Sequence, residues 1–125
     1  MTIPAETGFL RFMLLDDEAI IALDLAGMLQ DLGHSVVSMA TRVAGGMDFA
    51  RPGDLDMTIL DINAHGVASF PLAAILQDRS IPVIFASGYG ESGLIDGFRD
   101  ALVLTKPCGV GHLSQVVDKA RVAAA

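Results

Sequence analysis

Short apolar segments alternate with segments of helical periodicity along the chain, and this alternation is the strongest constraint on its fold. The apolar segments that suit strands are residues 9–15, 35–40, 57–60, 81–86 and 102–104. Strands that alternate with helices form a parallel sheet with helices on both faces and right-handed crossovers. The sequence therefore predicts an α/β fold, a doubly wound five-stranded parallel sheet of the flavodoxin-like order 2-1-3-4-5.

Two of the predicted helices have a clear apolar stripe. The first covers residues 18–32 and should stop at Gly33, because glycine readily adopts the left-handed conformation that ends a helix. The last helix begins at Val110. The residues at helical spacing that should face the core are Ile21, Leu25, Met28 and Leu32 in the first helix and Leu113, Val116, Val117 and Ala120 in the last.

The second and third helices are predicted from their ends. Thr41 is the expected N-cap of the second helix, in which Gly45-Gly46 is a weak point and which an Arg-Pro-Gly sequence ends. Ser69 is the expected N-cap of the third helix, and Pro71 is tolerable in its first turn.

The length of the chain indicates a single domain. Its 125 residues are enough to bury a real core and too few for two domains. We expect the domain to span residues 9–125, after a disordered lead of residues 1–8. Hydrophobic residues make up 52% of the chain and charged residues 18%, which is typical of a globular protein. This apolar content permits a homodimer without requiring one.

Charge and cysteine content limit the partners and the compartment. The net charge of −7, from 15 acidic and 8 basic residues, disfavours direct binding to nucleic acid or to an anionic membrane. No apolar run reaches the roughly 20 residues of a membrane span, and the first residues lack the basic start of a secretory signal. Cys108 is the only cysteine, which excludes an internal disulfide and fits a reducing compartment. We therefore expect a cytoplasmic protein.

Charged residues follow three of the predicted strands at the point where each strand ends. Asp16-Asp17 follows the first strand, Asp61 the third and Lys106 the fifth, and residues 61–67 should form a loop. The carboxyl ends of parallel strands meet at the edge where open α/β sheets bind ligands. Clustered carboxylates favour a cation such as Mg²⁺, and lysine is a good partner for phosphate. The pattern indicates phosphoryl transfer, although the paired acids alone are also explained as caps of the first helix.

In their order and spacing these motifs resemble the receiver domains of two-component response regulators, which have a CheY-like fold. The resemblance covers residues 9–122. It implies that Asp61 attacks the phosphorus of a phosphohistidine on a partner and becomes an acyl phosphate. Such a domain is a self-phosphorylating acceptor and not a turnover enzyme. The residues that carry the resemblance are Asp16, Asp17, Asp61, Ser87, Lys106 and Pro107.

The resemblance also implies roles for the residues around the acceptor. The Lys106 ammonium and the Ser87 hydroxyl would hold the phosphoryl oxygens. The implied ligands of Mg²⁺ are the side chains of Asp17 and Asp61 and the backbone carbonyl of Asn63. Asp16 would contact the cation through a water molecule.

Residues 85–90 indicate which subgroup of receiver domains the chain resembles. They read Phe-Ala-Ser-Gly-Tyr-Gly and are similar to the Phe-Ala-Thr-Gly-Tyr-Gly signature of the FAT GUY subgroup of receivers, which is a single-domain type. Many receivers have a switching aromatic residue three positions before the lysine, but here that residue is Val103. Signalling should therefore run through the glycine-rich residues 87–97, where any helix should be short and mobile. Cys108, where many receivers have Phe, is interpreted as a small packing residue.

Two other sequence motifs suggest different functions, but a feature of the sequence argues against each. Residues 88–93 spell G-x-G-x-x-G after a strand, as dinucleotide sites do, but Glu91 would face the pyrophosphate and the ribose-binding acid is absent. Residues 61–63 are similar to the Asp-x-Asp of haloacid-dehalogenase-type phosphatases, but the second acid, which would be the general acid, is missing.

The histidines show no metal-ligand spacing. We expect His34, His65 and His112 on the surface or in loops. His65 lies four residues after Asp61, so a minor role near the phosphate stays open.

The sequence thus predicts a receiver domain that takes a phosphoryl group from a histidine kinase or a histidine phosphotransfer protein. Phosphorylation would switch its binding to a downstream protein. The alternative from another class is a protein-binding module on the same fold that works without phosphorylation. A flavin or nucleotide binder is a third class that the flavodoxin-like fold leaves open.

Overall fold

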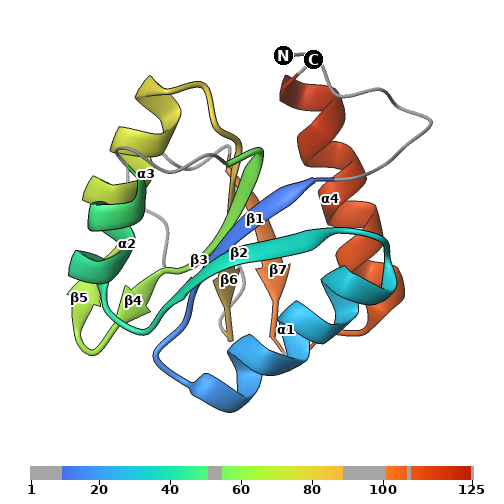
Figure 1. The fold of residues 1–125 in the computed structure, drawn as a ribbon, viewed down its shortest axis with the longest axis horizontal. Helices are drawn as coiled ribbons and strands as arrows, with labels where there is room; N and C mark the ends of the chain where they lie inside the picture. Colours follow the sequence, from blue (N-terminus) through green and yellow to red (C-terminus); the bar gives the residue numbers. More distant parts are fainter. Residues whose placement is uncertain (1–9, 51–54, 89–100, 107, 125) are drawn as a thin grey trace.

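The computed structural model describes residues 10–50, 55–88, 101–106 and 108–124. They form a five-stranded parallel sheet with helices on both faces (Figure 1). The strands of this sheet are β1 (Arg11–Leu15), β2 (Ser35–Ala40), β3 (Met57–Asp61), β6 (Val83–Ser87) and β7 (Leu102–Thr105). The helices are α1 (Ala19–Asp31), α2 (Val43–Ala50), α3 (Phe70–Asp78) and α4 (Val110–Ala124).

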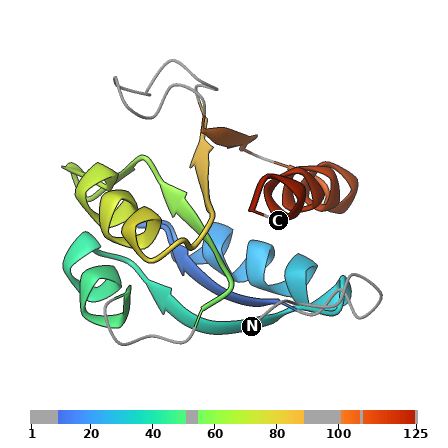
Figure 2. The same cartoon turned by 90° about the horizontal axis from the view of Figure 1, so that it is seen from above.

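The sheet has the order β2-β1-β3-β6-β7, and every neighbouring pair is parallel. Counted within the sheet this is the order 2-1-3-4-5, so the predicted fold is confirmed. Helices α1 and α4 cover one face and α2 and α3 the other (Figure 2). No helix in the described part of the chain is long and apolar enough to cross a membrane. The predicted lead (1–8), residues 89–97 of the glycine-rich segment and Pro107 lie outside the described residues.

Strand β1 is buried on both faces, as its continuous apolar sequence predicts for an inner strand of a parallel sheet. Phe12 and Leu14 pack toward α1 and α4, whereas Met13 and Leu15 pack toward α2 and α3. Their exposed fractions lie between 0% and 2%. Burial of side chains of this size stabilises the fold by about 1.5–3 kcal/mol each. A single strand therefore joins the two apolar layers.

Strand β2, at one edge of the sheet, contains a β-bulge. Phe12 pairs with Val36, but the next residue, Met13, pairs with Ser38, so that Val37 is an extra residue in β2. A bulge of this kind bends the strand locally and interrupts the regular alternation of its side chains between the two faces. Val37 remains 41% exposed.

Helix α1 packs on the sheet through a surface that is shifted from the predicted stripe. Its buried residues are Ala22, Leu25, Ala26 and Leu29. Of the predicted stripe only Leu25 is among them, and the other three members contact the core at its margin. The buried face includes the two alanines, Ala22 and Ala26, and is therefore centred about one position later than predicted. In α4 all four predicted inward residues are buried.

The starts of α2 and α3 differ from the predicted caps. The Gly46 N–H donates to the Arg42 carbonyl at 3.3 Å, so Arg42 and not Thr41 occupies the cap position of α2. Ser69 does precede α3, but its side chain makes no cap hydrogen bond. Its Oγ donates instead to the Ile62 carbonyl, 3.1 Å away.

Residues 61–67, predicted to be a loop, contain part of a short hairpin. Strands β4 (Asn63–Ala64) and β5 (Val67–Ala68) pair antiparallel. The two residues between them have positive φ angles, 52° at His65 and 77° at Gly66. Positive φ at both central residues is the geometry of a type I′ hairpin turn, which matches the twist of the strands. His65 is exposed there, as predicted.

His34 lies in the loop between α1 and β2, as predicted, but it is buried there and not on the surface. Its exposed fraction is 8%, and its ring centroid lies 5.3 Å from that of Phe12. The Leu10 N–H donates to His34 Nδ1 at 3.2 Å, which gives this polar ring a partner inside the fold. Burial, followed by the charge of Arg121, lowers the pKa of His34. His112, on α4, is exposed as predicted.

The glycine pair in α2 has different surroundings at its two positions. A Cβ on Gly46 would lie 2.8 Å from Leu72 Cδ2, and Leu72 of α3 is fully buried. A Cβ on Gly45 would meet only Ala40 Cβ, at the ordinary contact distance of 3.7 Å. Gly46 therefore permits the close packing of α2 on α3.

We predict opposite effects of substitution at these glycines. Gly46→Val should destabilise the protein by about 1–3 kcal/mol, because the new side chain overpacks the contact with Leu72. Gly45→Ala should stabilise it by about 0.5–1 kcal/mol through the higher helix propensity of alanine. Urea unfolding of both variants measures these changes. Equal stability of the two variants would contradict the proposed role of Gly46.

We also predict that protonation of His34 destabilises the fold. The folded-state pKa lies below the ordinary value of 6.5, so stability should fall as the pH drops from 6.5 through the folded-state pKa. His34→Phe cannot be protonated and should lose less stability than the parent between about pH 7.5 and about pH 5.5. Urea unfolding at both pH values tests this, and the same pH-dependent loss in both proteins would contradict it.

Candidate functional site

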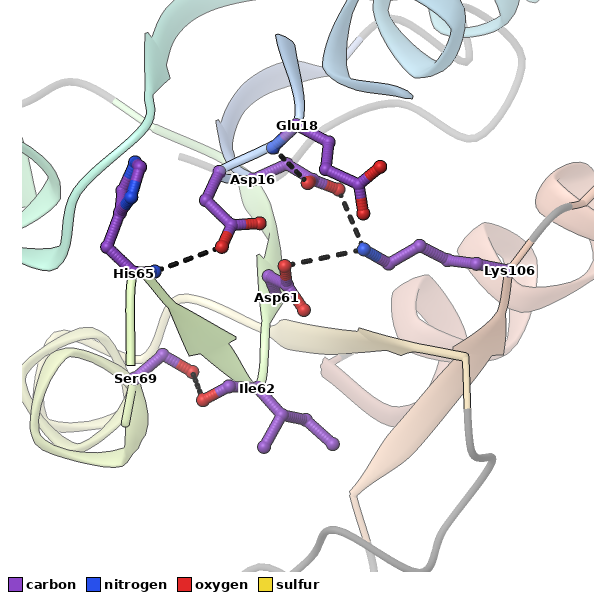
Figure 3. Close-up of polar contacts among 8 residues, drawn as sticks. Asp16, Glu18, Asp61, Ile62, His65, Ser69 and Lys106 are labelled. Carbon is purple, nitrogen blue, oxygen red and sulfur yellow. Dashed lines mark hydrogen bonds and ion pairs between the residues drawn. The ribbon is translucent and has the colours of Figure 1, made fainter. Parts of the chain in front are cut away.

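The carboxyl ends of β1, β3 and β7 meet at one edge of the sheet. Asp16 follows β1, Asp61 ends β3 and Lys106 follows β7. Lys106 Nζ lies 3.0 Å from Asp16 Oδ2 and 3.4 Å from Asp61 Oδ2 (Figure 3). One ammonium group thus bridges carboxylates from two neighbouring strands, and the structure brings together the residues that sequence spacing placed at this edge.

Asp16 has a partner for each of its carboxylate oxygens. Its side chain is 2% exposed, and Oδ2 accepts the hydrogen bond from Lys106. Oδ1 accepts a hydrogen bond of 2.9 Å from the Glu18 backbone N–H, just before α1. A capping role for Asp16 therefore accounts for one oxygen, and the other oxygen belongs to the charged cluster.

Asp17 belongs to the same acidic cluster and is partly exposed. Its Oδ2 accepts a hydrogen bond of 3.0 Å from the backbone N–H of His65, at the tip of the β4–β5 hairpin. This hydrogen bond is the main reason why the pKa of Asp17 is lowered. Asp17 is therefore held in its charged form.

Asp61 is in the opposite electrostatic situation. Burial raises its pKa to about 6, and repulsion from Asp16 and Asp17 acts in the same direction, against the attraction of Lys106. For Lys106, burial disfavours the ammonium, but the hydrogen bond to Asp16 and the charge of Asp61 prevail and raise its pKa. The cluster thus holds a charged lysine and a carboxylate whose negative charge is poorly stabilised.

Ser87 and Asn63 lie beside this cluster. Ser87 ends β6 and is 5% exposed, and the Lys106 backbone N–H donates to its carbonyl at 2.9 Å. Asn63 is exposed in β4, two residues after Asp61. A cavity of about 550 Å³ opens at this edge, and Asp61, Asn63, Ser87 and Lys106 all contribute to its wall.

The acidic residues fit a hard divalent cation. The carboxylate groups of Asp16, Asp17 and Glu18 each offer an oxygen, and these oxygens all lie within 4.8 Å of one another. Oxygen ligands of this kind are what Mg²⁺ prefers. Glu18 was not among the residues predicted from the sequence, although it is the third member of a continuous Asp-Asp-Glu run that could have indicated it.

The two residues that depart from common receiver sequences are packing residues in this structure. Val103 is half-buried against the apolar layer of α2 and α3. Cys108 is partly buried against the layer of α1 and α4, and burial raises the pKa of its thiol. A thiol with a raised pKa is a poor nucleophile at neutral pH, so the packing interpretation of Cys108 holds.

Comparison with proteins of known sequence finds response regulators among the relatives. No family model matches the chain. The phyllosphere-induced regulator PhyR of Methylorubrum extorquens is 29% identical over 118 residues, which cover 88% of this chain and 43% of that protein. The chain spans about half the length of the curated relatives it matches.

Solved structures extend this likeness over almost the whole chain. SdrG of Sphingomonas melonis is 31% identical, with a TM-score of 0.80 and coverage of 92% of this chain and 98% of SdrG. The receiver domain of the response regulator PhyR from Erythrobacter litoralis has the same fold, with a TM-score of 0.80 at 22% identity over 93% of this chain and 92% of that domain. The chain belongs to the response-regulator receiver domains.

Proposed function

We propose that this chain is the phosphoacceptor domain of a two-component or phosphorelay system, with Asp61 as the acceptor. The observation that carries the proposal is the Lys106 ammonium, which bridges Asp61 and Asp16 at the carboxyl edge of the sheet. Lysine at this position would neutralise an incoming phosphoryl group. SdrG, one of the similar proteins, has also been solved in a BeF3-activated conformation. That finding supports the same chemistry for a chain of this family.

In the proposed reaction an Asp61 carboxylate oxygen attacks the phosphorus of a phosphohistidine on the partner. An O–P bond forms while the P–N bond breaks, and the imidazole nitrogen takes the electron pair and then a proton from solvent. Lys106, which lies 3.4 Å from Asp61, would pair with one phosphoryl oxygen. The Ser87 hydroxyl would donate a hydrogen bond to another. The domain accepts one group and is not a turnover enzyme.

We propose Mg²⁺ as the cofactor of this transfer. Asp17, Asp61 and the backbone carbonyl of Asn63 would hold the cation, with Asp16 acting through water. When bound, Mg²⁺ neutralises charge on the transferred phosphoryl group. The close carboxylates of Asp16, Asp17 and Glu18 support this assignment, as does the raised pKa of Asp61, because a cation relieves repulsion among carboxylates.

The proposed partners follow from this chemistry. The donor is a histidine kinase or a histidine phosphotransfer protein in the cytoplasm. The output is a change in binding to a downstream protein, since phosphorylation adds a charge of about −1.5 to −2 next to Lys106 and Ser87.

We predict that acetyl phosphate with Mg²⁺ adds one phosphoryl group to the protein and that Asp61→Asn abolishes the addition. The amide cannot supply the nucleophilic oxygen anion. Intact-mass spectrometry measures the product. Asp24→Asn is the matched control, because Asp24 is an exposed carboxylate on α1 in the wall of the same cavity and should leave the yield unchanged.

Omission of Mg²⁺ should prevent the addition to the parent protein. Equal modification of the parent and Asp61→Asn would assign the acceptor to another residue. If no sample is modified, even by a phosphohistidine donor, the phosphorylation-independent binding module becomes the better assignment.

We further predict that Asp61→Asn stabilises the metal-free protein at neutral pH. The folded-state pKa of Asp61, about 6, lies above its ordinary value of 3.8, so ionisation of Asp61 lowers stability progressively as the pH rises from 3.8 to about 6, and the full loss is present above that pH. The gain should be on the order of 1–2 kcal/mol above pH 7 and should shrink as the pH falls through about 6. Urea unfolding measures it against Asp24→Asn. A gain that does not depend on pH would contradict this account.

A further inference from the structure

The β4–β5 hairpin contacts the acidic cluster through its backbone. The N–H of His65 donates to Asp17 Oδ2 at 3.0 Å, although 48 residues separate the two in sequence (Figure 3). Because the donor is a backbone group, the path of the hairpin decides whether this hydrogen bond forms. The identity of the side chain at position 65 matters mainly through the backbone conformation that it permits.

The conformation of His65 is unusual for a residue with a side chain. Its φ of 52° is left-handed, a region that residues with a Cβ rarely adopt. Gly66, with a φ of 77°, completes the type I′ turn. Contacts around the turn must therefore impose this conformation, and it is the conformation that directs the His65 N–H toward Asp17.

The base of the hairpin is fixed at two points. Ser69, which is fully buried, donates from both its Oγ and its N–H to the Ile62 carbonyl, at 3.1 Å and 2.9 Å. The Ile62 N–H in turn donates to the Ala86 carbonyl of β6 at 3.4 Å. Ile62 directly follows Asp61, so the hairpin is attached at its base beside the acceptor and at its tip to Asp17.

We propose that His65 is a positioning residue whose backbone N–H, presented by the β4–β5 hairpin, holds the Asp17 carboxylate at the cation site. The inference rests on the proposed function. The hydrogen bond engages Oδ2 of Asp17, and Oδ1 would be the oxygen that binds the cation. Since one hydrogen bond links the hairpin to a cation ligand, cation binding and hairpin order stabilise each other.

Two substitutions at position 65 separate the backbone donor from the side chain. His65→Pro removes the N–H and cannot adopt a φ of 52°. His65→Gly, the matched control, also removes the imidazole but keeps the N–H and tolerates positive φ. Mn²⁺ replaces Mg²⁺ as the probe, and the electron paramagnetic resonance signal of free Mn²⁺ measures its affinity.

We expect His65→Pro to bind Mn²⁺ about 10-fold more weakly than the parent and His65→Gly to stay within about twofold of it. Circular dichroism establishes that each variant is folded. Equal affinity of folded His65→Pro and His65→Gly would overturn the proposal.

If His65→Pro does not fold, NMR titration of the parent with Mg²⁺ decides. The His65 amide signal should shift at the same Mg²⁺ concentration as the Asp61 amide. A stationary His65 signal during saturation of the site would overturn the proposal. Failure of the proposed function gives a different pattern, in which the parent neither binds Mn²⁺ nor accepts a phosphoryl group.

Discussion

The Lys106 ammonium, placed between Asp16 and Asp61, is the interaction on which the functional edge of the sheet depends. Asp16 is 2% exposed, and a carboxylate buried to that extent without a cationic partner is strongly destabilising. Its partner, Lys106, is 90 residues away in sequence. The two residues meet because β1, β3, β6 and β7 lie in this order in a parallel sheet, so that their carboxyl ends share one edge. The strand order is thus a precondition for the charge balance of the site, and the charge balance in turn depends on the strand ends staying in register.

The three aspartates at this edge have three different environments. Asp16 has both oxygens engaged, by Lys106 and by the Glu18 N–H. Asp17 is stabilised as an anion by the His65 N–H, which lowers its pKa. Asp61 is the exception, because burial and neighbouring acids raise its pKa to about 6. The carboxylate that gains most from the arrival of a cation is therefore the one proposed to react.

The features that depend on local pattern could be predicted from the sequence. Continuous apolar runs identified the inner strands, and the parallel order then placed Asp61 and Lys106 at one edge. The burial of His34 could not be predicted in this way, because its hydrogen bond comes from the Leu10 N–H, a tertiary contact. The hairpin was missed because a His-Gly turn with positive φ is not one of the Asn-Gly or Asp-Gly signals. The shifted face of α1 likewise depends on tertiary packing, because small alanines and not the larger apolar residues of the predicted stripe are buried there.

The bulge at Val37 has a consequence for the behaviour of the protein in concentrated solution. β2 is an edge strand of the sheet, and an edge with regular, unpaired backbone groups is a template for the addition of strands from other molecules. The extra residue in β2 breaks that template, because a strand added outside it would lose register at the bulge. The β2 edge carries the exposed apolar side chains of Val37 and Met39. Its backbone geometry, and not charge, protects it against edge-to-edge polymerisation.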